Sequence, residues 1–276
     1  MNGVNNSETT KILICWSKGE RMKPEITDLA YMTALTYELV TQYDLLTLGA
    51  PTFPSLQKEA IYRFDPNTRG VLLFMQYKLS EHIVGTASSL KVDWGIPYYR
   101  FLIHPKNRSK RHELLLHLEE ANNLVYYIAP EFHTCSGLYE SLMQKALLNN
   151  STFWSPGAIG LLPANAARNT LSYRREINYG ILEPGKRRVD GVLKGKMLWN
   201  VIKDKFETNQ SETYDNEKLF LLGDQMLENY LKVLHTPKEQ RLIKDIRQGR
   251  NHIDPRDYLS LISILLYDCF VYIAVR

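Results

Sequence analysis

Apolar and polar residues follow two periods along the chain, one typical of helices and one typical of strands. From Thr27 to Val40, apolar residues recur at helical spacing, which predicts an amphipathic helix. A loop with prolines leads to AIYRFD at 60–65, the turn PNTRG and then VLLFMQYK at 71–78, which together predict a β-hairpin. Because the second arm is apolar at nearly every position before Gln76, we expect it to be buried on both faces at the centre of a sheet.

Strands and helices alternate through the middle of the chain. PYYRFLIH at 97–104 predicts a third strand, the leucine-rich segment 109–120 a helix, and LVYYIAP at 124–130 a fourth strand. This succession predicts a right-handed parallel crossover, so the sheet should be mixed. The segment 138–148 predicts another helix, and STFWSP at 151–156 predicts an edge strand. The expected fold class is therefore α/β, with a mixed central sheet flanked by helices.

The pattern changes after Lys196, where helical spacing replaces the strand-like runs. Helices are predicted at 197–206, 217–234, 237–247 and 256–267. The chain should therefore consist of an α/β core over residues 1–195 and a helical C-terminal region over residues 196–276 that packs on this core.

Composition narrows the class of protein. Of the 276 residues, 44% are hydrophobic and 23% are charged, which is the balance of a globular protein. Cys15, Cys135 and Cys269 lie far apart in the sequence, which argues against a disulfide framework or a cysteine-rich zinc site. The polar N-terminus lacks the pattern of a secretory signal, and no long apolar run spans a membrane. We therefore expect a cytoplasmic protein without membrane contact.

Positive charge gathers in two segments although the net charge is only +4. Such runs often form a solvated face, but a row of cations is also what a nucleic-acid backbone requires. DNA is the expected partner, with RNA as the alternative. The candidate nucleic-acid-binding residues are Lys106, Arg108, Lys110, Arg111, Arg174, Arg175, Lys186, Arg187 and Arg188.

Polar residues at the ends of the predicted hairpin could form an active site. Asp65 ends the first arm, and Gln76 and Lys78 lie near the end of the second. Positions two apart in a strand point to the same face, so Gln76 and Lys78 should project together while Tyr77 points away. An aspartate before a proline is also a common turn residue, and polar residues often mark the end of a strand.

These residue types suit a metal-dependent phosphodiesterase. Such an enzyme needs oxygen ligands for Mg²⁺ or Mn²⁺ and a cation beside the attacking water or the scissile phosphate. Glu59, just before the first arm, could add an oxygen ligand, and Glu38 on the preceding helix could reach the same cluster.

The order of these elements resembles the restriction-endonuclease-like superfamily, the PD-(D/E)XK nucleases. The resemblance covers residues 27–135 and is closest to the Mrr-like variant, which has glutamine in place of the acidic residue of the second motif. It implies that Asp65 is the principal metal ligand, that Gln76 is a second ligand through its side-chain oxygen, and that Lys78 polarises the water or stabilises the developing phosphorane charge. A DNA endonuclease of bacterial or phage-related defence is implied, acting as a homodimer or with a partner protein.

Two other functions stay open. Gln76 contributes less to neutralising a divalent cation than a carboxylate does, so a catalytically inactive nucleic-acid or protein binding module on the same fold is one alternative. The other is an HEPN-type ribonuclease, whose arginine-to-histidine spacing is matched by Arg111 to His117 and by Arg247 to His252. HEPN domains are all-helical, whereas strong strands are predicted here.

Overall fold

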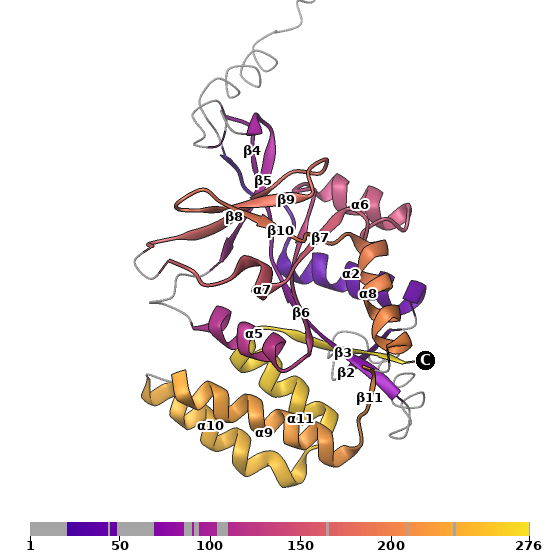
Figure 1. The fold of residues 1–276 in the computed structure, drawn as a ribbon, viewed down its shortest axis with the longest axis vertical. Coiled ribbons are helices and arrows are strands. Elements are labelled where there is room, and N and C mark those ends of the chain that lie inside the picture. Colours follow the sequence, from indigo (N-terminus) through magenta and orange to yellow (C-terminus); the bar gives the residue numbers. More distant parts are fainter. Residues whose placement is uncertain are drawn as a thin grey trace, which may run out of the picture.

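The computed structural model describes residues 21–43, 45–48, 69–85, 90, 94–103, 110–163, 166–208, 210–233 and 236–275. Within these residues the chain forms two six-stranded sheets and a set of helices around them (Figure 1). The predicted α/β class with a mixed sheet flanked by helices is confirmed. The first hairpin arm at 60–65, with Asp65 and Glu59, lies outside the described residues.

One sheet, called here the mixed sheet, has the strand order β2-β12-β3-β6-β7, with β11 also paired to β3. Only the β3–β6 pair is parallel among the pairs of this sheet. Its strands are β2 (Leu45–Leu48), β3 (Arg69–Tyr77), β6 (Leu124–Pro130), β7 (Ser151–Trp154), β11 (Glu212–Thr213) and β12 (Phe270–Val275). The predicted edge strand is β7, which ends this order.

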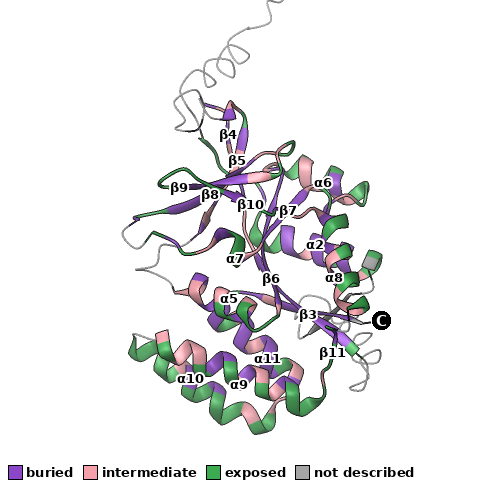
Figure 2. Ribbon diagram, in the orientation of Figure 1, coloured by how far each residue is buried: buried purple, intermediate pink, exposed green. Residues whose placement is uncertain are grey.

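The central position of β3 explains its apolar sequence. Leu72 and Phe74 face the cluster that includes α5, α9 and α11, while Leu73 and Met75 face the cluster that includes α2 and α8. Each of these four side chains is at most 1% exposed. The prediction of a strand buried on both faces is confirmed, because helices cover both sides of the sheet here (Figures 1 and 2).

The other sheet, called here the antiparallel sheet, has the order β1-β4-β5-β8-β9-β10. Its strands are β1 (Arg21–Met22), β4 (Glu81–Ile83), β5 (Tyr98–Ile103), β8 (Asn169–Tyr173), β9 (Tyr179–Glu183) and β10 (Arg187–Asp190). The predicted crossover from the third strand to the fourth is therefore wrong, because β5 belongs to this sheet and β6 to the mixed one. In β5, buried and half-buried positions are interspersed, whereas β6 is buried throughout. The parallel partner of β6 is β3.

The predicted helices are present, with shifted ends. Thr134 caps α6, since its hydroxyl accepts a hydrogen bond from the backbone N–H of Gly137 at 3.1 Å. Thr236 and Glu239 form a capping box at the start of α10. The helices are α2 (Asp28–Tyr43), α5 (Arg111–Glu120), α6 (Cys135–Met143), α7 (Pro156–Ile159), α8 (Gly195–Glu207), α9 (Asn216–Val233), α10 (Pro237–Gly249) and α11 (Pro255–Ile262). No helix within the described residues has the length and apolar character needed to cross a membrane.

The C-terminal region departs from the prediction because it is not helical throughout. After α11, a π-helical turn over Ser263–Tyr267 leads to β12, which inserts between β2 and β3. The helix predicted to Tyr267 therefore ends in a different geometry. The sequence FVYIAV of β12 is rich in aromatic and β-branched residues, which suits a central strand. Helices α9, α10 and α11 form a layer beneath the mixed sheet (Figure 1).

Candidate active site at the carboxyl end of β3

Gln76, near the carboxyl end of β3, and Lys78, directly after this strand, lie on one face of the mixed sheet. The side chain of Gln76 is buried, and its Nε2 donates to Asp268 Oδ2 at 3.1 Å and to the Tyr267 carbonyl at 3.4 Å. The Lys78 ammonium lies over the Tyr127 ring, 5.8 Å from its centroid. Tyr77 points to the opposite face, where its hydroxyl forms a hydrogen bond with the Tyr272 hydroxyl at 2.6 Å. The predicted alternation of these side chains is confirmed.

Asp268 brings a carboxylate to this site from the end of the chain. It adopts the left-handed conformation, with φ 58°, directly after the π-helical turn. Its Oδ2 accepts from Gln76 and forms an ion pair with Arg111 Nη1 at 3.2 Å. Sequence reasoning missed Asp268, although a charged residue between the apolar runs SILLY and CFVYIAV was a signal for a turn at a functional edge.

Asp28 adds a second carboxylate to the electrostatic environment of Lys78. Burial raises the pKa of Asp28, an effect that the Lys78 ammonium opposes and the Asp268 carboxylate strengthens. Burial lowers the pKa of Lys78, while Asp268 raises it and Arg111 lowers it further. A partly desolvated ammonium among two carboxylates and a guanidinium can bind a phosphate or exchange protons with a water molecule more readily than an exposed lysine.

Tyr127 is held in place behind Lys78 by a buried histidine. His112 Nε2 lies 2.8 Å from the Gly160 carbonyl and must donate to it, so in the neutral ring Nδ1 accepts from the Tyr127 hydroxyl at 2.8 Å. Burial lowers the pKa of His112, which keeps the ring neutral at pH 7. These two hydrogen bonds of His112 fix the orientation of the Tyr127 ring, over which the Lys78 ammonium lies.

Glu38 does not belong to this site, contrary to the prediction. Its carboxylate is buried and accepts from the backbone N–H groups of Leu147 at 2.9 Å and Leu148 at 3.0 Å. Both leucines belong to the cluster on the other face of the mixed sheet, together with Leu35 and Leu39 of α2. The helical period of α2 places Glu38 three residues after the buried Leu35, and the turn that follows α6 covers its carboxylate there.

The described residues do not complete a metal site by themselves. Among them, no group of three or more histidine, cysteine, aspartate or glutamate side chains is arranged to hold a metal ion. Asp65 and Glu59, the other predicted oxygen ligands, lie outside these residues. The fit of a divalent cation to the predicted ligand set therefore rests on the sequence alone.

Several of the predicted nucleic-acid-binding arginines make contacts within the protein. Arg174 pairs with Glu176 at 3.7 Å and also donates to the Trp94 carbonyl. Arg187 donates to the carbonyls of Ile159 and Leu161. These guanidinium groups satisfy backbone oxygens at loop and helix ends, which is a structural use of the positive charge.

Other members of this group lie on the surface. Arg188 stacks over the Tyr179 ring with its guanidinium carbon 4.0 Å from the centroid, and it pairs with Asp190 at 2.7 Å. Lys186 is exposed at the tip of the β9–β10 turn, with φ 51°. Lys110 precedes α5 and is half-buried, whereas Lys106 and Arg108 lie outside the described residues.

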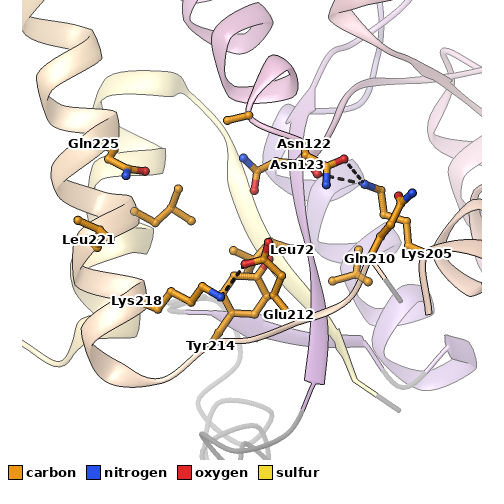
Figure 3. A pocket seen from close by; sticks show the side chains of 13 residues that line it. Leu72, Asn122, Asn123, Lys205, Gln210, Glu212, Tyr214, Lys218, Leu221 and Gln225 are labelled. Carbon is orange, nitrogen blue, oxygen red and sulfur yellow. Dashed lines mark hydrogen bonds and ion pairs between the residues drawn. The ribbon is translucent and has the colours of Figure 1, made fainter. Parts of the chain in front are cut away.

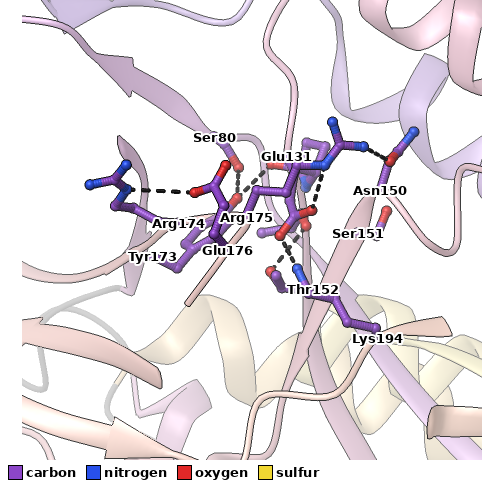
Figure 4. A network of polar contacts seen from close by, with 12 residues as sticks. Ser80, Glu131, Asn150, Ser151, Thr152, Tyr173, Arg174, Arg175, Glu176 and Lys194 are labelled. Atoms are coloured by element: carbon purple, nitrogen blue, oxygen red, sulfur yellow. Dashed lines mark hydrogen bonds and ion pairs between the residues drawn. The ribbon is translucent and has the colours of Figure 1, made fainter. Parts of the chain in front are cut away.

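A second polar cluster lies where β6 ends (Figure 4). Glu131 follows β6, and its side chain is only 1% exposed while it pairs with Lys194 and, at 3.7 Å, with Arg175. Burial raises the pKa of Glu131, and Lys194 opposes this. The Tyr173 hydroxyl from the antiparallel sheet bonds the Pro130 carbonyl at 2.6 Å and also contacts Ser80. This cluster ties the two sheets together at the edge where β3 and β6 end.

His133 stacks on a second histidine near this edge. The ring centroids of His82 and His133 are 4.5 Å apart, and Tyr99 also stacks on His82 at 4.8 Å and lies 6.5 Å from His133. Burial lowers the pKa of His82 to about 4, and His133 contributes to this shift. The described ring contacts of His133 belong to the junction of the two sheets.

Comparisons with known proteins leave the geometry as the basis for any functional argument. No protein-family model, curated protein or solved structure matches this chain.

Proposed function

We propose that this protein is a metal-dependent nuclease that hydrolyses phosphodiester bonds, with DNA as its expected substrate and RNA as the alternative. The observation that carries the proposal is that Gln76, near the carboxyl end of β3, and Lys78, directly after it, lie on one face of the mixed sheet. Because β6 runs parallel to β3, both strands end at the same edge of the sheet. Ligands of α/β sheets bind outside the carboxyl ends of such strands.

Each residue has a defined role in this proposal. Asp65 and Gln76, with Glu59 as a further candidate, would hold Mg²⁺ or Mn²⁺ through oxygen atoms. The ion would supply positive charge to the scissile phosphate. Lys78 would orient the attacking water and stabilise charge that develops on the phosphate. Asp268 accepts from Nε2 of the Gln76 amide, so the amide oxygen is the atom that would bind the ion in this proposal.

A cleavage assay with matched lysine variants tests the proposal. Plasmid DNA and single-stranded RNA are incubated with wild type, Lys78→Met and Lys203→Met, each with Mg²⁺, Mn²⁺ or chelator. Lys203 is an exposed residue of α8 and serves as the control. Wild type and Lys203→Met should cleave only with metal, and Lys78→Met should be slower by about 10²-fold or more with its fold retained.

The outcome against the proposal is equally defined. Cleavage that persists in chelator, or that Lys78→Met retains in full, would mean that another site or a contaminating nuclease is responsible. Absence of cleavage by wild type on both substrates, with both metals, would favour the binding module described next.

A binding module without catalysis is the second candidate. It is favoured by the neutral side chain of Gln76, which is engaged with Asp268, and by the absence of a metal-holding group among the described residues. In that case wild type and Lys78→Met would bind DNA with affinities that chelator does not change. The HEPN alternative is less favoured, because the two six-stranded sheets of the described residues are foreign to an all-helical domain.

The biological setting belongs to the same proposal. Nucleases that cut both strands need two active sites, which a symmetric dimer supplies. A homodimer or a complex with a partner protein, in bacterial or phage-related defence, is therefore the assembly that we propose.

A further inference from the structure

A pocket of about 190 Å³ opens beside the amino half of β3, toward the opposite end of this strand from Gln76 and Lys78. Its walls come from β3, the turn between α5 and β6, the end of α8, β11 and α9 (Figure 3). Elements from distant parts of the sequence therefore meet around one cavity. None of its lining residues takes part in the site proposed above.

The pocket carries one excess positive charge. Lys205 of α8 and Lys218 of α9 enter it from opposite walls (Figure 3). Glu212 lies between β3 and α9 and pairs with Lys218 at 2.8 Å. Two ammonium groups thus face one carboxylate in the lining.

Lys205 is held by neutral oxygen atoms among the described residues. Its ammonium donates to the backbone oxygen of Asn122 at 3.1 Å and to the side-chain oxygen of the same residue at 2.9 Å, both of which are neutral. No carboxylate among the described residues forms an ion pair with Lys205. Burial lowers the pKa of its ammonium, and Glu212 only partly opposes this. A cation that has lost water and gained no anion is the group to which an anionic ligand would bind.

The remaining lining sets the size and polarity of a ligand. Gln210 and Gln225 present amides, while Leu72, Leu221 and Leu222 form an apolar wall. A cavity of about 150 Å³ is known to hold a benzene molecule, so this pocket has room for roughly eight non-hydrogen atoms. A macromolecule or a whole nucleotide is too large to be enclosed.

We propose that this pocket binds a small organic or inorganic anion, with its carboxylate or phosphate group on Lys205 and its remainder against the amides and leucines of α9. Residues of β3, β11 and α9 all line the pocket. A bound ligand would therefore contact both the helical layer and the central strand and would hold them together. The proposal does not depend on the nuclease activity.

Calorimetric titration with succinate and with inorganic phosphate tests the proposal, at ionic strength matched with chloride. The proteins are wild type, Lys205→Met, Lys205→Arg and the exposed control Lys203→Met. At least one anion should bind wild type saturably. Lys205→Met should weaken its affinity about tenfold or more, while Lys205→Arg and Lys203→Met should stay within about threefold of wild type. Succinate alone would identify a carboxylate ligand, and phosphate alone a phosphate ligand.

A measurement on wild type covers the case in which Lys205→Met does not fold. The side-chain amide resonances of Asn122, Gln210 and Gln225 are followed by NMR during the same titration, and they should shift with one common dissociation constant. Failure of both anions to bind saturably, resonance shifts confined to other parts of the protein, or undiminished binding by a folded Lys205→Met would each overturn the proposal.

Discussion

The side-chain amide of Gln76 donates to the carboxylate of Asp268 across 3.1 Å, which joins the carboxyl end of β3 to the turn that precedes β12. A neutral donor at position 76 is what allows this contact, because a carboxylate there would face another carboxylate. The neutral glutamine at this position is therefore matched by an aspartate from the C-terminal part of the sequence.

Gln76→Glu should test this relationship directly. At neutral pH the new carboxylate, at a buried position, would lie against the exposed Asp268 carboxylate in place of a hydrogen-bond donor, so the free energy of unfolding should fall by about 1–3 kcal/mol in chelator. If a divalent cation binds at this edge, Mg²⁺ should restore part of the loss, because the added charge strengthens its binding. Urea unfolding with Mg²⁺ and with chelator measures both effects.

Gln76→Met is the matched control, since it removes the hydrogen bond without adding charge and should show no Mg²⁺ effect. If Gln76→Glu and wild type have the same free energy of unfolding in chelator, the Gln76 amide does not contact the Asp268 carboxylate.

Glu38→Ala should destabilise the protein without a specific effect on catalysis. The substitution leaves the N–H groups of Leu147 and Leu148 without their acceptor in a buried turn, so the free energy of unfolding should fall by about 2–3 kcal/mol. Urea unfolding measures this loss. Glu140→Ala, at an exposed position of α6, should change stability little.

The same variant separates the structural role from the catalytic role first predicted for Glu38. Any nuclease activity, expressed per folded molecule at low temperature, should equal that of wild type within about twofold. A loss of activity comparable with that of Lys78→Met would return Glu38 to the active site.

The sequence predicts those parts of the fold that one local pattern determines. The apolar run of β3 implied burial on both faces, and the i, i+2 rule placed Gln76 and Lys78 together. Asp28 and Asp268 could not be predicted as neighbours of Lys78, because they lie far apart in the sequence and the pairing of β12 with β3 is what places Asp268 beside this site. The helical period of α2 likewise places Glu38 beside the buried residues of that helix, but it does not reveal that the turn at Leu147 and Leu148 will cover its carboxylate.

Arg187 and Arg188 should respond differently to truncation although they are adjacent in β10. Arg188→Ala removes an exposed cation, so affinity for DNA should fall severalfold and the slope of log affinity against log salt should decrease by about 1. Arg187→Ala removes the donor to the Ile159 and Leu161 carbonyls, so it should lower stability by about 1 kcal/mol. Fluorescence anisotropy at several salt concentrations and urea unfolding separate the two effects.

Lys232→Ala, at an exposed position of α9, is the control for loss of one positive charge. Equal weakening of DNA binding by Lys232→Ala and Arg188→Ala would show that net charge, rather than the surface of β10, determines the affinity.

Stability should decline in acid because of His82. Its folded-state pKa is lowered to about 4 from an ordinary value of 6.5, so the unfolded chain binds more protons between these values. The contribution of this group is therefore fully present above pH 6.5 and is lost as the pH falls toward 4. His82→Phe keeps an aromatic ring in contact with Tyr99 and His133 but cannot be protonated, so its unfolding midpoint in urea should depend less on pH over this range. His117→Phe, at an exposed position of α5, is the control, and its unfolding midpoint should depend on pH as that of wild type does. If the pH dependence of His82→Phe also equals that of wild type, the acid sensitivity belongs to other groups such as His112.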